Sequence, residues 1–529
     1  MKSLPHAHPV MTCKQARELE SQVLSDADAE WNAMKRAGRG IAHAVLLDYQ
    51  ELLPVPQQLR VLALIGKGNN GGDALIACGE LLAEYPRATV HLIMSASVDE
   101  LRPLAKRAYD QLEGRVRKHT VAKEADVAAV RDLLEVVADG AAIDICMDGL
   151  LGMSFVPPLR SPMTSILEAV NAFEGIRLRA AVDLPSGKGD EGGAISFHAD
   201  FTYATGIAKQ AIFEGIADCG RVRYIDLGFF DGAPGSEIDA FEHILQPRVL
   251  EPLQKLRPAS VDKRAFGHLF IVGGSAYMPG ALLMAVQAAV RSGVGLVTAF
   301  APASVAAALS AQVPEAMWVP WPETANGTLN PRALPLLVDR LNYATAVLCG
   351  PGMGRDRNTE MVAQDIIKNA ACPVILDADA LRQKVIELAP KRKADYGPLI
   401  VTPHMGEFMR IAKLAERDYS NETLRQFCQH YRVMAVSKGP NTRICDGESI
   451  IYNTHGGPVL SRGGSGDLLS GLIGSMLAQD NTNTQTALAR GVMLHGLAAQ
   501  RLARKNGQVM VSTTELLDYL PDVIRADLG

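Results

Sequence analysis

Short apolar runs recur along the chain, and each ends in glycine, proline or a polar residue. In the first half, the runs at 60–66, 88–96, 142–149 and 179–187 predict buried strands, and the segment 72–85 has a helical pattern. Strands that alternate with helices in this way predict a mostly parallel sheet with helices on both faces. The expected fold of this half is a Rossmann-like three-layer α/β sandwich.

The same alternation begins again in the second half. Its predicted strands lie at 268–274, 294–302, 345–352, 373–381, 398–404 and 432–439. These strands end in glycine, proline, aspartate or histidine, and ligands of open α/β sheets bind at the carboxyl ends of the strands. We therefore expect a second α/β domain with its site at those ends.

The stretch between the two patterns is rich in proline and has no strong strand. We place a domain boundary there, which divides the chain into domains 1–247 and 248–529. The two halves share no internal repeat, so the pattern indicates a fusion of two different domains. The length of 529 residues agrees with this, because single cores stop growing at about 250–300 residues.

Composition narrows the class of protein. The chain is 48% hydrophobic and 21% charged with a net charge of −5, which shows no footprint for nucleic-acid binding. Its eight cysteines form no C-x-x-C pair, which favours free thiols in a reducing compartment. We see no signal-peptide pattern and no apolar run of about 18 residues that could span a membrane. The default expectation is a cytoplasmic protein.

A glycine-rich turn follows the first predicted strand. Gly66, Gly68 and Gly71 match the G-x-G-x-x-G pattern of dinucleotide-binding turns, which would suggest a dehydrogenase. That interpretation is weak, because Ser95 and Ser97 stand where an acid is expected about 20 residues later. Backbone N–H groups at the start of a helix suit an anionic ligand, whereas a turn that only allows close packing is the alternative.

Two further strand ends in the first half carry polar side chains. Asp148 follows one strand, and Asp183 and Ser186 follow the next. A single aspartate at a strand end often only caps the following turn. The oxygens of Asn70, Asp148 and Ser186 would together suit a hard monovalent or divalent cation.

The segments GKGNNGGDAL, DGLLG and VDLPSG, in this order, resemble the NAD(P)H-hydrate epimerase domain. The resemblance implies a substrate site formed by Asn69, Asn70, Gly71, Gly72, Asp73, Gly152 and Asp183. It also implies that Asn70, Asp148 and Ser186 hold K⁺ and that Asp183 is the catalytic acid/base. The sequence GMSFVPP at 152–158 departs from the glycine- and arginine-bearing phosphate loop of the family.

In the second half, Gly463, Gly464 and Gly466 precede Asp467 and an apolar helix. The start of a helix favours a negative charge, so Asp467 could be a helix cap or could lie beside a bound phosphate. Beside a phosphate, it could take the proton from a hydroxyl that attacks a phosphoryl group. This G-G-x-G-D pattern resembles the ribokinase-like superfamily.

Five more segments occur in the order of one branch of that superfamily: 273–297, 350–354, 377–381, 402–408 and 437–442. With GGSGD they resemble the ADP- or ATP-dependent NAD(P)H-hydrate dehydratase. The resemblance implies that Ala281, Gly352, His404 and Asp467 line the hydrate site. It implies a nucleotide site at Lys438, Gly439, Pro440, Asn441, Thr442 and Gly466. One acid of 377–381 could meet Mg²⁺.

Some of these residues also have simpler interpretations. His404 could be a structural hydrogen-bonding group and Lys438 a solvated surface lysine. The segment DKRAFG at 262–267 retains only part of the family's H-K-G-x-x-G motif, and Gly457 stands where the family has asparagine.

Together the two resemblances imply nicotinamide nucleotide repair. The first half would interconvert the R and S forms of hydrated NADH or NADPH. The second would dehydrate the S form at the expense of ADP. Two alternatives stay open: a first half that only binds nucleotide, and a small-molecule kinase that uses Asp467. The families assemble as oligomers, so we expect a homo-oligomer, although the sequence shows no partner motif.

Overall fold

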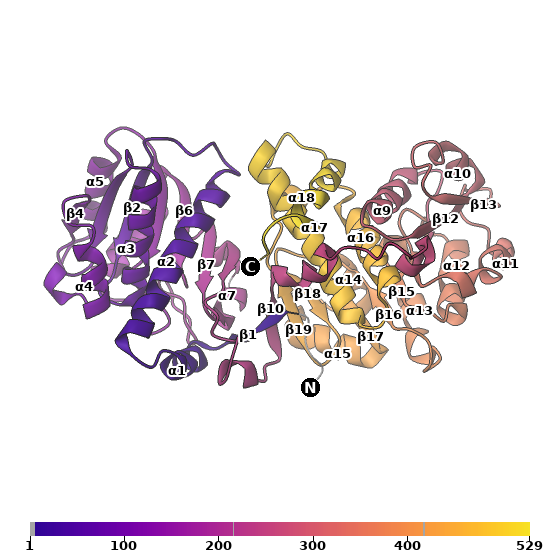
Figure 1. Ribbon diagram of the computed structural model, residues 1–529, viewed down its shortest axis with the longest axis horizontal. Coiled ribbons are helices and arrows are strands. Elements are labelled where there is room, and N and C mark those ends of the chain that lie inside the picture. Colours follow the sequence, from indigo (N-terminus) through magenta and orange to yellow (C-terminus); the bar gives the residue numbers. More distant parts are fainter. Residues whose placement is uncertain (1–5, 215, 416–417, 529) are drawn as a thin grey trace. The chain divides into compact units, whose positions relative to one another are not determined.

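The computed structural model describes residues 6–214, 216–415 and 418–528, and the chain forms two compact units. The N-terminal unit comprises His8–Ala240, and the C-terminal unit comprises the chain from Phe241 onward together with the described residues up to Ala7. Each unit has a central, mostly parallel sheet with helices on its faces, so the predicted α/β fold class is confirmed (Figure 1). The strand β10 (Glu242–Leu245), which precedes the boundary expected near 248, falls within the C-terminal unit.

The N-terminal sheet is parallel, with the strand order β4-β3-β2-β5-β6-β7-β9. A short parallel pair also joins β1 and β8. The strand bounds are β1 (Ala7–Met11), β2 (Arg60–Ile65), β3 (Thr89–Met94), β4 (Arg117–Thr120), β5 (Ile143–Gly149), β6 (Ile176–Val182), β7 (Phe201–Thr205), β8 (Ala208–Lys209) and β9 (Arg221–Ile225).

The helices of this unit cover both faces of its sheet. Their bounds are α1 (Cys13–Val23), α2 (Ala27–Tyr49), α3 (Asn69–Glu84), η1 (Val98–Glu100), α4 (Pro103–Asp110), α5 (Val127–Ala138), α6 (Met163–Ala172), α7 (Gln210–Glu214), α8 (Ile216–Cys219) and η2 (Gly235–Glu237). In β2, Ala63 packs with the core under α2, α3 and α4, whereas Leu62 and Leu64 pack with the core under α5 and α6. Because successive side chains of a strand point to opposite faces, a strand covered on both sides is apolar throughout.

The C-terminal sheet has the order β13-β12-β11-β14-β15-β16-β17-β18-β19-β10. The strands from β13 to β17 are parallel, the steps through β18 and β19 are antiparallel, and β10 is parallel to β19. The strand bounds are β11 (His268–Val272), β12 (Leu296–Pro302), β13 (Met317–Trp321), β14 (Ala346–Cys349), β15 (Val374–Leu376), β16 (Leu399–Val401), β17 (Val433–Ser437), β18 (Thr442–Cys445) and β19 (Ile450–Asn453).

Three helices of the C-terminal unit, α9, α16 and α17, pack closely on one another. A Cβ at Gly471 would lie 2.3 Å from the backbone oxygen of Ala285, so only glycine lets α16 approach α9 this closely. The longer helices are α9 (Pro279–Arg291), α10 (Ala303–Leu309), α12 (Arg357–Asn369), α14 (Met405–Ala412), α15 (Asn421–Tyr431), α16 (Ser465–Gln479) and α17 (Thr484–Asn506). The shorter ones are η3 (Pro247–Gln254), η4 (Lys263–Phe266), η5 (Pro331–Ala333), α11 (Pro335–Val338), η6 (Leu341–Tyr343), η7 (Ala378–Ala380), α13 (Gln383–Ile386), η8 (Ala389–Lys391), η10 (Pro458–Leu460), η11 (Thr513–Tyr519) and α18 (Leu520–Ile524).

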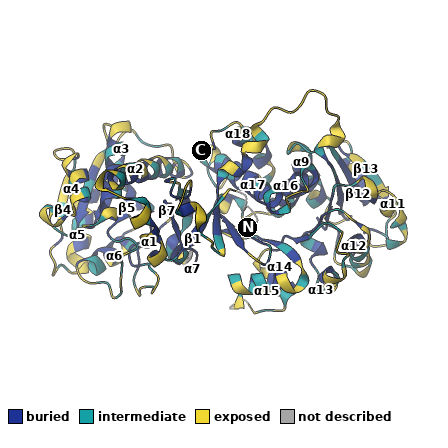
Figure 2. Cartoon of the chain, turned by 60° about the horizontal axis from the view of Figure 1, so that its bottom comes forward, coloured by how far each residue is buried: buried dark blue, intermediate teal, exposed yellow. Residues whose placement is uncertain are grey.

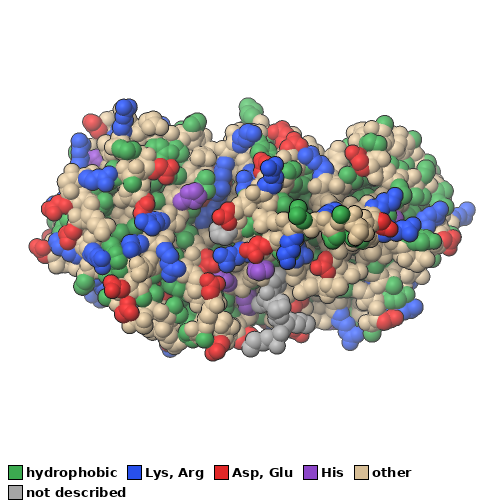
Figure 3. Space-filling view, in the orientation of Figure 1, with side chains coloured by type: hydrophobic (Ala, Val, Ile, Leu, Met, Phe, Trp, Pro, Cys, Tyr) green, Lys and Arg blue, Asp and Glu red, His purple; other side chains and the backbone are tan. Residues whose placement is uncertain are grey.

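Burial follows this layering in each unit. The central strands are buried, and the exposed positions lie on loops and on the outer sides of helices (Figure 2). On the face shown in Figure 3, basic and acidic side chains are interspersed. Within the described ranges, no helix combines the length and apolarity needed to cross a membrane.

A buried ion pair joins α2 to the edge of the N-terminal sheet. The guanidinium of Arg223 donates to the carboxylate of Asp48 at 2.9 Å, and both side chains are almost completely buried. Removing one partner of such a pair leaves a buried charge without its counter-ion, which typically costs about 3–5 kcal/mol.

We therefore expect Arg223→Met to lower the free energy of unfolding by about 3 kcal/mol or more. Urea denaturation followed by circular dichroism measures this loss. The matched control is Arg39→Met, because Arg39 pairs with Glu80 at 2.9 Å on the surface, with 65% and 38% of the side chains exposed. An exposed pair contributes about 1 kcal/mol or less. Equal losses in the two variants would contradict the role of the buried pair.

Candidate active sites

A cavity of about 500 Å³ opens at the carboxyl ends of β2, β5 and β6 in the N-terminal unit. Five residues expected in the substrate site line it: Asn69, Asn70, Asp73, Gly152 and Asp183. They come from three loops that are far apart in sequence, and the parallel sheet brings these loops to one edge.

Two other residues of the glycine turn do not line this cavity. A Cβ at Gly71 would lie 2.2 Å from the backbone oxygen of Gly66, and a Cβ at Gly72 would lie 2.7 Å from the sulfur of Met34. These glycines therefore let the first turn of α3 pack against β2 and α2. Some residues of this turn therefore serve close packing, and others line the cavity.

Asp148 is completely buried at the end of β5. It accepts hydrogen bonds from the backbone N–H and the hydroxyl of Ser186, at 2.7 and 2.6 Å. Burial raises the pKa of Asp148 to about 6, although the bonds from Ser186 and Leu150 oppose this rise. No Lys or Arg forms an ion pair with this carboxylate among the described residues.

Asn70 lies next to this pair. Its side-chain Nδ2 donates to the backbone oxygen of Leu151 at 2.7 Å, so its Oδ1 remains available toward Gly152 and the cavity. The structure thus brings Asn70, Asp148 and Ser186 together around the loop at 150–152. These oxygen donors, one of them charged and buried, have the chemistry that suits a hard cation.

Asp183 follows β6 in a left-handed backbone conformation, with φ of +64°. One of its oxygens, Oδ1, accepts hydrogen bonds from the backbone N–H and the hydroxyl of Thr205, at 3.1 and 3.0 Å. The same oxygen accepts a hydrogen bond from the ammonium of Lys209 at 2.5 Å. The carboxylate is therefore fixed through Oδ1 at the wall of the cavity.

The motifs missed two charged residues of this site, Lys209 and Glu20. Lys209 is fully buried in β8, and burial would lower its pKa, but Asp183 and Glu20 outweigh this effect and raise it. Glu20 projects from α1 into the cavity. A single lysine in the otherwise apolar stretch before 210 was the only sequence signal for Lys209, and Glu20 had none.

Basic side chains stand at another part of the same cavity. Lys67, Arg102 and Lys123 line it, and they come from the loops after β2, β3 and β4. In the divergent segment 152–158, Gly152 and Phe155 are lining residues, whereas Arg160 is not among them. The basic side chains of the cavity therefore come from the loops after β2, β3 and β4. In the family pattern, an arginine comes instead from the phosphate loop, which corresponds to 152–158 here.

In the C-terminal unit, Asp467 lies in the first turn of α16. The cap of this helix is Gly464, with φ of +88°, and no side chain makes a capping hydrogen bond there. Asp467 is therefore not the helix cap. Burial, followed by the neighbouring carboxylate of Asp377, raises its pKa to about 7, although Lys438 opposes the rise.

Lys438 links the other strand ends to this helix. Its ammonium lies 3.0 Å from Oδ1 of Asp377 and 3.8 Å from Oε2 of Glu407. A Cβ at Gly466 would lie 3.2 Å from the same ammonium, so Lys438 and Gly466 are adjacent, as expected for one nucleotide site. Only 19% of the Lys438 side chain is exposed, which excludes a solvated surface lysine.

The two acids of 377–381 have different partners. Asp377 accepts hydrogen bonds from Thr402 at 2.7 Å and from Lys438, whereas Asp379 accepts one from the backbone N–H of Gly354 at 3.0 Å and pairs with Arg355. Both still raise the pKa of Asp467. Asp377 and Asp379 are therefore held by different partners, and both contribute negative charge near Asp467.

His404 caps α14. Its Nδ1 accepts a hydrogen bond from the backbone N–H of Glu407 at 3.3 Å, and the carboxylate of Glu407 accepts one from the backbone N–H of His404. His404 is thus a structural hydrogen-bonding group through its Nδ1. The ring is nevertheless 61% exposed, so its Nε2 can also meet a ligand.

Ala281 and Gly352 are neighbours, as the resemblance implies. Gly352 has φ of +61°, and a Cβ there would lie 2.3 Å from the backbone oxygen of Met278 and 3.0 Å from the Cβ of Ala281. Small residues at both positions keep the loop at 350–354 close to the start of α9.

The loop at 438–442 contains a buried polar group without a protein partner. The side-chain nitrogen of Asn441 is buried and makes no hydrogen bond among the described residues. Gly439 and Pro440 are exposed, and Thr442 begins β18. A bound ligand that offers an acceptor would satisfy Asn441.

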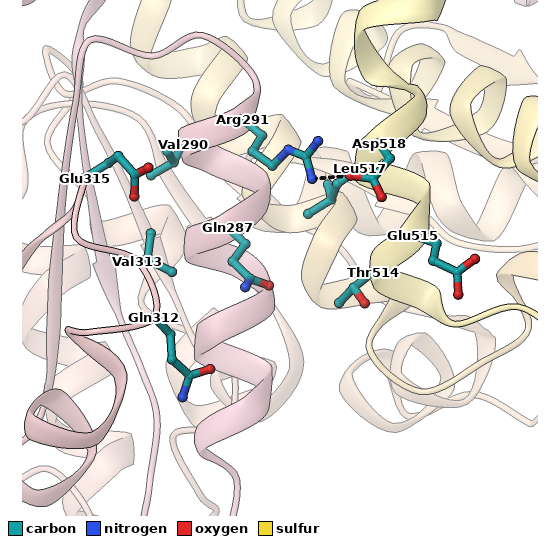
Figure 4. Close-up of a pocket in the computed structure, with 10 residues that line it drawn as sticks. All are labelled: Gln287, Val290, Arg291, Gln312, Val313, Glu315, Thr514, Glu515, Leu517 and Asp518. Atoms are coloured by element: carbon teal, nitrogen blue, oxygen red, sulfur yellow. Dashed lines mark hydrogen bonds and ion pairs between the residues drawn. The ribbon is translucent and has the colours of Figure 1, made fainter.

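A cavity of about 340 Å³ in the C-terminal unit contains none of the expected site residues (Figure 4). It lies between α9, the segment 312–315 and η11. Arg291 is its only lining cation, and it points toward Asp518 with an ion pair of 2.7 Å. The charge of Arg291 is therefore paired within the protein.

In both units, buried carboxyl groups and one lysine meet at the carboxyl ends of parallel strands. These are the features of a two-domain α/β enzyme. A sequence model described as NAD(P)H-hydrate dehydratase matches residues 269–522, and one described as YjeF-related protein N-terminus matches 31–211.

Curated relatives match along nearly the whole chain. The bifunctional NAD(P)H-hydrate repair enzyme Nnr of Gloeobacter violaceus is 31% identical and covers 97% of both chains. The protein of the same name from Moorella thermoacetica is 28% identical over 93% of this chain and 92% of its own. The chain therefore belongs to the family of bifunctional NAD(P)H-hydrate repair enzymes.

A solved structure of the ADP/ATP-dependent NAD(P)H-hydrate dehydratase from Bacillus subtilis, co-crystallised with ATP and Mg²⁺, is also similar. It is 28% identical, covers 52% of this chain and 95% of its own, and has a TM-score of 0.45.

Proposed function

We propose that this protein repairs hydrated NADH and NADPH with two activities. The N-terminal unit interconverts the R and S epimers, and the C-terminal unit dehydrates the S epimer at the expense of ADP or ATP. The observation that carries the proposal is Asp467, a carboxyl group that is not a helix cap, with a pKa of about 7 beside Lys438 and the glycine turn. A group with this pKa can accept a proton at neutral pH.

Asp467 supplies the base for the dehydratase. It takes the proton of the C6 hydroxyl while that oxygen attacks the terminal phosphoryl group of the nucleotide. The phosphate ester then leaves as phosphate, and loss of the C5 proton restores the ring double bond. Lys438 and the backbone N–H groups at the start of α16 offset the negative charge of the phosphates.

Mg²⁺ fits this site as a companion of the nucleotide. Among the described residues, no group of three or more His, Cys, Asp or Glu side chains could hold a metal ion by itself. Mg²⁺ usually binds through one or two carboxylates together with substrate phosphates. Asp377 and Asp379 are the nearest candidates, and the ion would supply positive charge to the transferred phosphoryl group.

Asp467→Asn should reduce the nucleotide-dependent recovery of NADH absorbance from the S hydrate by at least about 100-fold, because the base is lost. In the wild type, the rate should rise as the pH rises through about 7, because Asp467 acts in its deprotonated form. The control is Asp522→Asn, which changes an exposed carboxylate on α18.

Two results would contradict this role. Full activity of Asp467→Asn would exclude Asp467 as the base. A stable phosphorylated product, seen by mass spectrometry without recovery of absorbance, would identify a small-molecule kinase.

Asp183 is the proposed acid/base of the epimerase, supported by its place at the cavity wall and its fixed orientation. In Asp183→Asn, the S epimer should still be repaired. The R epimer should accumulate, because it is converted to the S epimer only at the spontaneous rate. Chromatography of separated epimers measures this. If the wild type also leaves the R epimer at its spontaneous rate, the N-terminal unit only binds nucleotide.

K⁺ is the proposed ion of the N-terminal unit, supported by the oxygen donors Asn70, Asp148 and Ser186. The buried carboxylate of Asp148 would gain a counter-charge, and the ion would brace the loop at 150–152 against the substrate.

Replacing choline with K⁺ should raise the melting temperature of the wild type, because only the folded state presents this site. Asp148→Asn should remove most of that rise, since it removes the charged ligand. Thermal melts in the two salts at equal ionic strength test this. An equal rise in the wild type and the variant would mean that K⁺ acts elsewhere.

All eight cysteines are free, which supports work in a reducing compartment such as the cytoplasm. Assembly into a homo-oligomer stays a prediction.

A further inference from the structure

Glu20 is a carboxyl group of the epimerase cavity that the family motifs do not assign. It lies on α1, whose buried residues Ala16 and Leu19 anchor the helix to the N-terminal unit. Its side chain lines the same cavity as Asp73 and Asp183. Among the described residues, no hydrogen bond or ion pair reaches the side chain of Glu20, whose backbone oxygen accepts from Leu24 within the helix cap. A partly buried carboxyl group without a partner is available to a ligand in that cavity.

Asp183 lines the same cavity, and its other oxygen is free of protein partners among the described residues. All three described donors, the N–H and hydroxyl of Thr205 and the ammonium of Lys209, end on Oδ1. No hydrogen bond of the described residues reaches Oδ2. The bonds to Oδ1 fix the direction in which Oδ2 points.

Several charged groups surround Glu20. Asp183 follows β6, Lys209 lies on β8, Asp73 on α3 and Glu30 on α2, and Arg17 lies on α1 itself. Lys67, Arg102 and Lys123 line the other part of the cavity. Burial raises the pKa of Glu20 to about 7; Lys209 opposes this rise, and Asp183 and Glu30 add to it.

The chemistry of the substrate requires two proton-transfer groups. C6 of the hydrated ring bears a hydroxyl and is bonded to N1, so it is a hemiaminal carbon. Its configuration can invert when the C6–N1 bond breaks. A base removes the hydroxyl proton, the C6=O bond forms, the C6–N1 electron pair moves to N1, and an acid protonates N1. Rotation of the aldehyde and closure by the reverse steps give the other epimer.

We propose that Glu20 is the acid of this reaction and that Asp183, through Oδ2, is the base. Glu20 donates the proton to N1 as the ring opens and takes it back as the ring closes. Lys209 is a positioning residue, because it contacts Asp183 and does not line the cavity. This inference rests on the proposed epimerase function.

The test compares Glu20→Gln with Glu18→Gln. Glu18 is an exposed carboxylate on the same helix, so it is a matched control for charge and for folding. With purified R epimer, kcat of Glu20→Gln should fall by at least about 100-fold, whereas KM should change little. Nucleotide-dependent repair of the S epimer should stay at the wild-type rate in both variants, which shows that the C-terminal unit is folded, and the unchanged KM for the R epimer shows the same for the N-terminal unit.

The pH profile separates a proton donor from a structural role. Glu20 must be protonated to donate, so the wild-type rate should fall as the pH rises through about 7. The residual rate of Glu20→Gln should lack this fall. Asp73→Asn should raise KM and keep the fall. Lys209→Met should lower kcat but should also keep the fall in rate at alkaline pH.

Each contrary result has a distinct meaning. Full epimerase activity of Glu20→Gln in an active wild-type background would overturn the role of Glu20 alone. Loss of the alkaline fall in Asp73→Asn, with its retention in Glu20→Gln, would assign the acid to Asp73 and overturn the proposal. A wild type that only matches the spontaneous rate would overturn the epimerase function itself, and the proposal with it.

Discussion

Each site of this protein depends on one buried lysine placed among carboxyl groups. Lys438 pairs with Asp377 in the C-terminal unit, and Lys209 pairs with Asp183 in the N-terminal unit. A carboxylate in a buried place is costly unless a cation compensates it. Each lysine offsets this cost for the carboxylate that it pairs with. Burial still raises the pKa of nearby acids such as Asp467. Groups of different charge can therefore coexist within one site.

The parallel sheets make these arrangements possible. Strands of a parallel sheet all end at the same edge, so loops that are far apart in sequence meet there. In the N-terminal unit, the loops after β2, β5 and β6 form one cavity, and α1 adds Glu20 to its wall. In the C-terminal unit, the loops after β15 and β17 meet the start of α16. Glycines allow the close approaches, as at Gly466 beside Lys438.

Most central strands were predictable, but the edge strands and some buried interior strands, such as β7 and β19, were not. Every predicted strand overlaps an observed strand, because a strand buried on both faces leaves a continuous apolar run, although several predicted runs extend into the following loop. The strand β4 was missed, since Arg117–Thr120 is mostly exposed and has no apolar pattern. The short pair β1 and β8 was missed for a similar reason, because two paired residues leave no periodic signal.

The sequence by itself determined the α/β class, the family and the kinds of residues in each site, because apolar runs and glycine turns are local signals. It also indicated Asp183 and Asp467 through their motifs. Only the tertiary structure decided which groups stand beside them. Lys209 and Glu20 reach the N-terminal cavity from β8 and α1, and the raised pKa of Glu20 comes from burial and neighbouring charges. Such effects depend on distances in space, and no local pattern in the chain records them.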